Sequence, residues 1–207
     1  MTKISFVYFD VGGVVLKDLS DTDKWEQILA KLGLDHFDKE EVEDIYRAHD
    51  NDICVGNMHV DELLPFYSEH FDITIPANYS LQKEVIDNFD TNPPIWPIIE
   101  ACQQKYRIGI LSDQWPDMFP ELVNRRLLPP FNWNPIILST IEKIRKPMPE
   151  IYQLAQQKAG VPPQEILFID NREKNLAPAR DLGWQTFLYD SSNYDQASAD
   201  LAKFLGL

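Results

Sequence analysis

The chain has 207 residues, of which 44% are hydrophobic and 25% charged, so it can bury a substantial core and is not of the disordered class. Its formal net charge of −14 repels phosphate backbones and anionic lipids, so we expect neither nucleic acid nor a membrane surface as a partner. The same charge opposes an anionic substrate, so any phosphate site must be built from local groups. No apolar run approaches the roughly 18 residues that span a bilayer, and the first residues lack a signal peptide's apolar region. We therefore expect a cytoplasmic protein, and no motif indicates its oligomeric state.

The first predicted element is a short strand. Residues 4–9 form an apolar run rich in β-forming side chains, and the run stops at Asp10, which a Val-Gly-Gly segment follows. This pattern predicts a buried strand that ends in a tight loop.

The stretch after this strand is helical and contains no second strand of comparable clarity. Helical patterns occupy residues 24–32, 40–48, 60–69 and 81–89. A cluster of prolines at residues 93–97 then ends the helical block, because proline terminates helices and stiffens linkers. A helical insertion directly after the first strand suggests a lid over that strand's carboxyl end. We therefore assign residues 17–90 to a helical cap, and residues 1–16 and 91–207 to a core domain.

Strands and helices alternate through the rest of the chain. A helix over residues 149–159 has Pro149 in its first turn and Gly160 at its stop. A second helix over residues 175–182 should hold Pro178 in its first turn, where a missing N–H does no harm. The alternation predicts an α/β fold, with a parallel sheet covered by helices on both faces. Short apolar runs predict the strands at residues 106–111, 135–138, 166–169 and 186–189.

Polar side chains follow the predicted strands at the points where the strands end. Because ligands bind outside the carboxyl ends of parallel strands, we expect these side chains to gather at one edge of the sheet. Together with Lys146, they supply a carboxylate nucleophile, a hydroxyl donor, a fixed cation and a second acidic cluster. Phosphoryl transfer depends on such groups for positioning and charge neutralisation. The strand-end residues are Asp10, Ser112, Asp113, Asp170 and Asn171.

Four segments of the chain together resemble the motifs of the haloacid dehalogenase superfamily. They occur in the expected order and cover the whole core, and the most similar subgroup includes sugar-1-phosphate phosphatases and the N-terminal phosphatase domain of soluble epoxide hydrolases. Residues 56–63 also look like the turn-then-helix element of that subgroup's cap. The segments are residues 9–15 (motif I), 111–113 (motif II), 145–152 (the motif III region), and 166–171 with 175–183 (motif IV and its helix).

The resemblance implies a Rossmann-like α/β core with a helical cap, and a Mg²⁺-dependent phosphomonoesterase that acts on a small phosphorylated metabolite. Asp10 would attack phosphorus and form an aspartyl-phosphate. Ser112 and Lys146 would hold the transferring oxygens and take part in catalysis, and Asp113 would join them in binding substrate. The implied Mg²⁺ ligands are Asp10, the backbone carbonyl of Gly12, Asp170 and Asn171.

Two positions depart from the pattern of the family. Gly12 stands where its phosphatases usually have a second aspartate, which serves as general acid and base, and such help is typically worth about 10²–10⁴-fold. Asn171 stands where the subgroup usually has an aspartate that binds the metal, and an amide oxygen coordinates without charge. We therefore expect a weakened metal site and a preference for good leaving groups. His49 and His59 are the candidates for a replacement proton donor.

Two other functions remain open at this stage. One is a metal-independent 2-haloacid dehalogenase-type hydrolase, a branch that also lacks the acid replaced by Gly12, although it usually has a neutral residue in place of Asp170. The other is a degenerate, non-catalytic member that binds a ligand. The large aromatic side chains do not help to choose between these functions, since we interpret Trp25, Trp96 and Trp115 as packing residues rather than substrate platforms.

Overall fold

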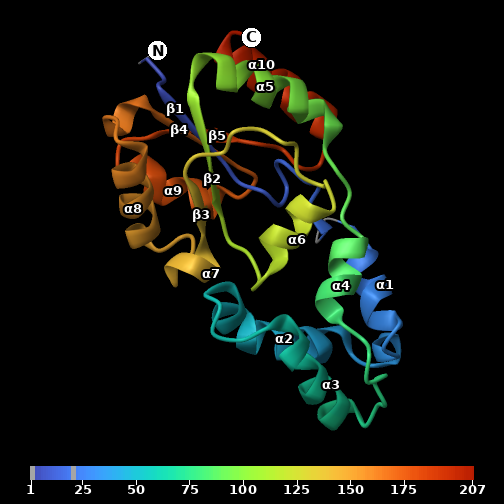
Figure 1. The fold of residues 1–207 in the computed structure, drawn as a ribbon. Coiled ribbons are helices and arrows are strands. Elements are labelled where there is room, and N and C mark those ends of the chain that lie inside the picture. Colours follow the sequence, from blue (N-terminus) through green and yellow to red (C-terminus); the bar gives the residue numbers. More distant parts are fainter. Residues whose placement is uncertain (1–2, 20–21) are drawn as a thin grey trace.

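The computed structural model describes residues 3–19 and 22–207, and a sheet of five parallel strands forms its centre (Figure 1). The strand order is β3-β2-β1-β4-β5, so the first strand of the chain lies in the middle. The predicted α/β class is confirmed, and every predicted strand is present with ends within two residues. The strands are β1 (Phe6–Phe9), β2 (Arg107–Ser112), β3 (Ile136–Leu138), β4 (Ile166–Asp170) and β5 (Gln185–Leu188).

Helices cover both faces of this sheet, so the central strand is fully buried. Val7 and Phe9 point into a core shared with α5 and α10, whereas Phe6 and Tyr8 point into a second core shared with α8 and α9. All four side chains are inaccessible to solvent. This explains why the strand reads as a continuous apolar run rather than an alternating one. The core helices are α5 (Trp96–Lys105), α6 (Met118–Asn124), α7 (Ser139–Glu142), α8 (Pro149–Ala159), α9 (Glu173–Asp181) and α10 (Tyr194–Leu205).

The boundaries of α8 agree with the sequence signals, but those of α9 do not. Helix α8 begins at Pro149 and ends before Gly160, which has a left-handed φ of 63° and so closes the helix without strain. Helix α9 begins at Glu173, two residues earlier than predicted. Pro178 is therefore its sixth residue and lies inside the helix, so the prediction of a first-turn position was wrong. The helix loses one backbone hydrogen bond there.

Four further helices lie beyond the carboxyl ends of the strands (Figure 1). The chain leaves the sheet and returns to it at one place, because Leu16 bridges to Thr91 and the Lys17 N–H donates to the Asp90 carbonyl at 3.0 Å. Helix α2 contacts α7, and α4 contacts α6. The four are α1 (Lys24–Ala30), α2 (Lys39–Cys54), α3 (Leu63–Phe71) and α4 (Leu81–Asp87). Short 3₁₀ turns are η2 (Leu34–His36), η3 (Val60–Glu62), η4 (Pro93–Ile95) and η5 (Pro163–Glu165).

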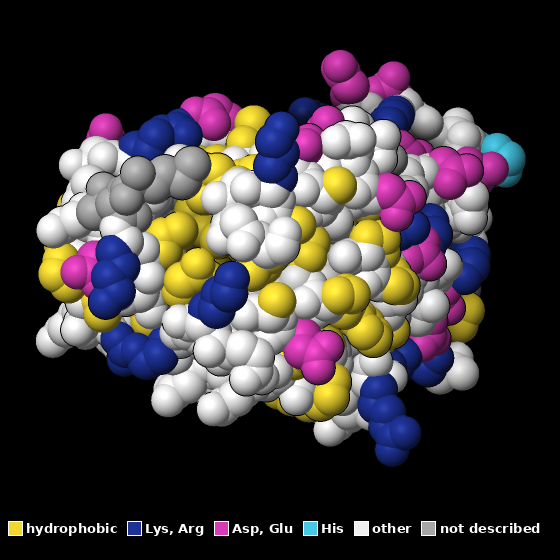
Figure 2. All heavy atoms as spheres, turned by 90° about the horizontal axis from the view of Figure 1, so that it is seen from above, with side chains coloured by type: hydrophobic (Ala, Val, Ile, Leu, Met, Phe, Trp, Pro, Cys, Tyr) yellow, Lys and Arg dark blue, Asp and Glu magenta, His cyan; other side chains and the backbone are white. Residues whose placement is uncertain are grey.

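Charged side chains of both signs are mixed on the surface seen from above, over α5 and α10 (Figure 2). Apolar atoms lie between them, and neither sign forms a continuous field on this face. Within the described residues, no helix combines the length and the apolar character needed to cross a membrane. With a net charge of −14, positive potential at a binding site has to come from cations of the site itself.

Candidate active site

Three neighbouring strands end in polar side chains at the same edge of the sheet. Asp10 directly follows β1, Ser112 ends β2, and Asp170 ends β4. The parallel register pairs Phe9 with Ile110 on one side and with Ile169 on the other, which aligns the three strand ends. The sheet therefore brings together three side chains that lie far apart in the sequence.

Lys146 joins two of these side chains. It lies in the loop before α8, and its Nζ is 2.8 Å from Asp10 Oδ2 and 2.7 Å from Asp170 Oδ2. The three groups are almost completely buried, with exposed fractions of 6% for Asp10, 3% for Lys146 and 0% for Asp170. Buried charges of this kind are found where they are paired, and here two carboxylates share one ammonium group.

Burial and pairing act in opposite directions on the ionisation of Asp10. The pKa of Asp10 is raised to about 7, because burial and the nearby carboxylate of Asp170 together outweigh the opposing charge of Lys146. Hydrogen bonds from Lys146 and Ser112 favour the ionised form of Asp10. For Lys146, burial would lower the pKa, but Asp10 and Asp170 raise it well above its ordinary value. Lys146 is therefore a permanent cation beside a carboxylate that titrates near neutral pH.

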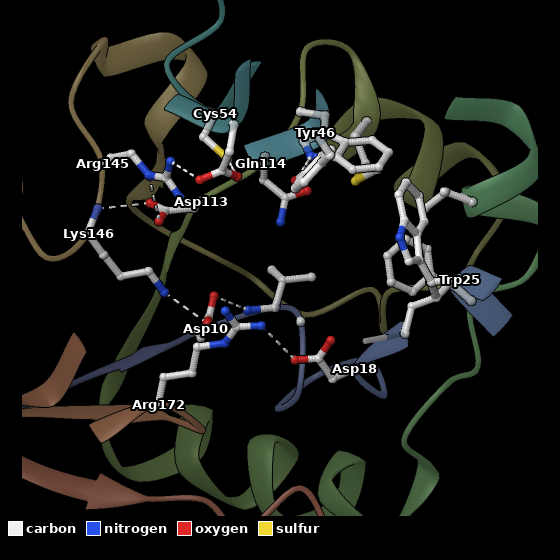
Figure 3. A pocket seen from close by; sticks show the side chains of 18 of the residues that line it. Asp10, Asp18, Trp25, Tyr46, Cys54, Asp113, Gln114, Arg145, Lys146 and Arg172 are labelled. Carbon is white, nitrogen blue, oxygen red and sulfur yellow. Dashed lines mark hydrogen bonds and ion pairs between the residues drawn. The ribbon is translucent and has the colours of Figure 1, made fainter. Parts of the chain in front are cut away.

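Asp10 lies on the wall of a cavity of about 500 Å³ between the sheet edge and helices α1, α2 and α4 (Figure 3). The part near Asp10 is lined by charged side chains of both signs, and the opposite part, near Trp25, combines apolar side chains with the charged Glu26, Lys39, Glu43 and Arg47. Such a cavity suits a ligand with an anionic group at one end and an apolar group at the other. The lining cations are Lys39, Arg47, Arg145, Lys146, Arg172 and Lys174; the lining acids are Asp10, Asp18, Glu26, Glu43, Asp50 and Asp113; the apolar residues include Trp25, Tyr46, Val85, Phe89, Trp115, Met118 and Leu122.

Asp113 also lines the cavity, but its carboxylate holds other protein groups. Its Oδ1 accepts the backbone N–H of Lys146 at 3.0 Å, and its Oδ2 lies 3.6 Å from Arg145 Nε. Arg145 in turn pairs with Asp50 of α2, with 2.6 Å between Nη1 and Oδ2. Asp113 is thus well placed to position the Lys146 loop and to connect it with α2.

The carboxylate of Asp170 is fully used by the protein. Its Oδ1 accepts the Arg172 N–H at 2.8 Å, its Oδ2 accepts Lys146 Nζ, and the Asn175 amide donates to both oxygens at 3.1 Å. Asp170 does not reach the cavity wall. Its role in this arrangement is to fix Lys146 and the start of α9.

The four residues expected to hold Mg²⁺ are not gathered around the cavity. Asp10 and Gly12 line it, but Asn171 does not. The Asn171 amide packs against Gly13, where an added Cβ would come within 2.1 Å of Nδ2, and that nitrogen donates to Asp18 Oδ2 at 3.2 Å. Its Oδ1 is buried and accepts no hydrogen bond from the residues that the structure describes. Nor do residues 3–19 and 22–207 contain a group of three or more His, Cys, Asp or Glu side chains suited to a metal ion.

Several cavity residues were not identified from the sequence. Asp18, Gln114, Arg145 and Arg172 all line the cavity. Gln114 is buried, and its Nε2 donates to Ser112 Oγ at 2.9 Å, so it orients the predicted hydroxyl. A weak signal for Gln114 and Arg172 existed, since each follows a predicted site residue within two positions.

The two histidines considered as proton donors do not line the cavity. His49 Nδ1 is 2.8 Å from the Ile45 carbonyl on its own helix, and its ring packs against Phe66. His59 Nδ1 accepts the Asp61 N–H at 3.2 Å and caps η3. Both side chains therefore have local structural contacts.

Comparisons with known proteins agree with this geometry. The model of the haloacid dehalogenase-like hydrolase family matches residues 4–206. Bifunctional epoxide hydrolase 2 of Sus scrofa is 27% identical over 221 residues; the match covers 96% of this chain but only 38% of that protein.

Solved structures share the fold at low sequence identity. An HAD family enzyme from Bacteroides thetaiotaomicron superimposes with a TM-score of 0.80 at 18% identity, over 99% of both chains. Its complex with magnesium and inorganic phosphate gives 0.74 at 19% identity, over 92% of this chain and 96% of that one. An L-2-haloacid dehalogenase gives 0.63 at 22% identity, over 89% and 83%. These likenesses establish the fold and leave the choice between phosphate and halide chemistry to the site.

Proposed function

Because the chain belongs to the haloacid dehalogenase-like hydrolase family, we propose that it hydrolyses phosphate monoesters of small metabolites through an aspartyl-phosphate on Asp10. The observation that carries this proposal is the position of Asp10 at the charged end of the cavity. Its carboxylate is fixed 2.8 Å from a buried lysine, and Arg145 and Arg172, paired with Asp50 and Asp18, line the same cavity in a protein with a net charge of −14. Such a local cluster of cations suits a dianionic phosphate.

The proposed reaction has two steps. In the first, a carboxylate oxygen of Asp10 attacks phosphorus, the bond from phosphorus to the ester oxygen breaks, and the leaving group departs with its electron pair and takes a proton from water. In the second, water attacks phosphorus, the bond from phosphorus to the Asp10 oxygen breaks, and the carboxylate leaves with the electron pair; the proton of the attacking water neutralises the hydroxide formed in the first step, and phosphate departs. Lys146 would stabilise the negative charge on the transferring oxygens. Ser112 is buried and does not line the cavity, so its role would be to hold the ionised Asp10 by a hydrogen bond.

We assign the supporting roles from the same contacts. Asp113 positions the Lys146 loop, and its binding of substrate is therefore indirect. Residues 17–90 serve as the cap, since α1, α2 and α4 contribute cavity residues and the two connections to the sheet run side by side. Closure of this cap over the cavity would exclude water from the aspartyl-phosphate.

Magnesium was part of the sequence prediction, and a structural relative is crystallised with magnesium and phosphate. The donor set of this chain does not fit the ion in the expected way. Both Asp170 oxygens are occupied by protein donors, and Asn171 lies off the cavity wall with its amide directed to Asp18. The proposed reaction therefore relies on the protein's own groups.

A haloacid dehalogenase is the second candidate, because Gly12 provides no carboxylate for a leaving alcohol. In that reaction Asp10 would attack carbon and release halide. The paired carboxylate of Asp170 favours the phosphatase, since the dehalogenase branch usually has a neutral residue at this position.

A substrate panel tests the proposal. Phosphate release from aryl, acyl, glycosyl and alkyl phosphates, and halide release from 2-haloacids, are measured with and without added Mg²⁺. We expect phosphate release, and Asp10→Asn should abolish it, whereas Asp44→Asn on the exposed side of α2 should not. Halide release that depends on Asp10 would support the dehalogenase instead, and no turnover of either class would support the non-catalytic, ligand-binding alternative.

A further inference from the structure

The side chain of Arg172 places a positive charge on the cavity wall. Arg172 lies in the turn between β4 and α9, and its side chain lines the cavity. Its Nη2 is 3.2 Å from Asp18 Oδ2, and Figure 3 shows the guanidinium between the side chains of Asp10 and Asp18 in that view. The turn is fixed, because the backbone N–H of Arg172 donates to Asp170 Oδ1 at 2.8 Å.

The surrounding carboxylates act on this guanidinium. Burial alone would lower the pKa of Arg172, but the charge of Asp18, its hydrogen bond, and the charges of Asp10 and Asp170 raise it above its ordinary value. The field of the nucleophile therefore reaches Arg172. The nucleophile therefore has a buried cation, Lys146, in direct contact and a half-exposed cation, Arg172, whose guanidinium is held by Asp18.

Asn171 fits this arrangement better than an aspartate would. Its Nδ2 donates to the same Asp18 oxygen that contacts Arg172, at 3.2 Å in both cases. A carboxylate at position 171 would put a negative oxygen in place of the amide donor, facing the Asp18 oxygen, and would compete with Asp18 for the guanidinium. The loss of negative charge at position 171 and the Asp18–Arg172 pair are therefore mutually consistent features of one network.

We propose that Arg172, positioned by Asp18 and Asn171, binds the transferring phosphoryl group and provides the charge neutralisation for which relatives use a divalent cation. Hydrolysis at this site then requires no divalent metal. The inference rests on the proposed phosphomonoesterase function and names the group that holds its substrate. A guanidinium suits the task, since its planar set of five N–H donors matches two phosphate oxygens at once.

Binding of inorganic phosphate tests the inference without turnover. Titration calorimetry is performed on the full chain in EDTA and again in excess Mg²⁺. We expect phosphate to bind in EDTA, with an affinity within about threefold of that in Mg²⁺. Arg172→Met should lower the affinity about 10- to 100-fold, as expected for loss of a charged hydrogen bond, with Arg172→Lys intermediate. The matched control is Arg180→Met, an exposed arginine of α9 that pairs with Glu173 away from the cavity.

A second variant tests the network in the opposite direction. Asn171→Asp should weaken phosphate binding in EDTA, and Mg²⁺ should restore it, because the new carboxylate disturbs the Asp18–Arg172 pair and offers a charged metal ligand. Unfolding curves of each variant establish that the fold is retained.

Phosphate binding by the parent protein only in the presence of Mg²⁺ would overturn the inference, as would an Arg172→Met variant that binds as tightly as the parent. An Asn171→Asp variant with unchanged binding in EDTA would also overturn it. Arg172-dependent phosphate binding in a protein that hydrolyses no ester would support the anion site and refute the phosphatase, so the two failures are distinguishable.

Discussion

The buried nucleophile should reduce the stability of the fold, so Asp10→Asn should stabilise the protein at alkaline pH. The pKa of Asp10 rises from 3.8 to about 7 in the folded state. The folded chain therefore keeps a proton that the unfolded chain loses, and stability falls as pH rises from about 4 to about 7. At about 1.4 kcal/mol per pKa unit, the shift of about three units corresponds to an upper figure of about 4 kcal/mol.

Asparagine removes this ionisation but satisfies one neighbouring donor less well. The Asp10 oxygens accept the Val11 N–H at 2.7 Å and contact Lys146 Nζ at 2.8 Å, and an amide has only one oxygen. That loss costs about 1–2 kcal/mol, which leaves a net gain of about 2 kcal/mol above pH 8. Near pH 5.5 most Asp10 side chains of the folded parent are protonated, so the stabilisation by Asp10→Asn should be smaller by about 2 kcal/mol than above pH 8.

Urea unfolding of the parent and of Asp10→Asn at pH 5.5 and pH 8.5 measures this difference. The exposed Asp200→Asn serves as a control for the removal of a surface carboxylate and should give no such pH dependence. A stability difference between Asp10→Asn and the parent that is the same at both pH values would refute the reasoning, and so would a variant less stable than the parent at pH 8.5.

Three further predictions concern turnover. The rate should rise with pH through about 7, because only the ionised form of Asp10 attacks. Asp170→Asn removes a neighbouring negative charge and should therefore shift this rise to lower pH. A pH profile of kcat/KM that is the same in the variant and the parent would contradict this. Aryl or acyl phosphates should be hydrolysed up to about 10²–10⁴-fold faster than alkyl phosphates, for want of a proton donor at Gly12. Gly12→Asp should narrow that gap, since an added Cβ there meets no atom within 4 Å; a flat dependence on leaving-group pKa in the parent would show that a donor exists elsewhere. Trp25→Ala should lower kcat/KM for aryl phosphates by about tenfold and leave small alkyl phosphates nearly unchanged, and equal losses for both would contradict a role for the apolar end of the cavity.

Strand positions were predictable because most strands are apolar runs bounded by polar or turn residues; β5 (Gln-Thr-Phe-Leu) is the exception and is only half-buried. Helix ends were less so, as α2 shows. Its apolar pattern covers residues 40–48, but the helix continues to Cys54. The last turn, with little apolar character of its own, is held by burial of Ile53 and by the Ser139 hydroxyl, which donates to the Cys54 carbonyl at 2.5 Å. Such long-range contacts leave no local mark in the sequence.

The convergence of Asp10, Ser112, Lys146 and Asp170 was also predictable, because parallel strands end at one edge of a sheet. Arg172 was not, since an arginine after a strand resembles a solvated surface residue. Its direction depends on the turn between β4 and α9, which the backbone bond to Asp170 fixes.

The aromatic side chains show a related limit. Trp25 and Trp115 were interpreted as packing residues, and both do pack against the core, yet both also line the cavity. The sequence around each tryptophan is compatible with a packing role and with a place on the cavity wall. Only the position of α1 and of the segment after β2 relative to the strand ends distinguishes a packing residue from a cavity wall.

Trapping the covalent intermediate tests the central claim most directly. The protein is mixed with an aryl phosphate, quenched within the first turnover, treated with borohydride to reduce any acyl-phosphate, and digested for peptide mass spectrometry. We predict that Asp10 is recovered as the reduced alcohol, and that Asp44→Asn gives the same product while Asp10→Asn gives none. Turnover of the ester with Asp10 unmodified, or with the modification on another residue, would contradict the account.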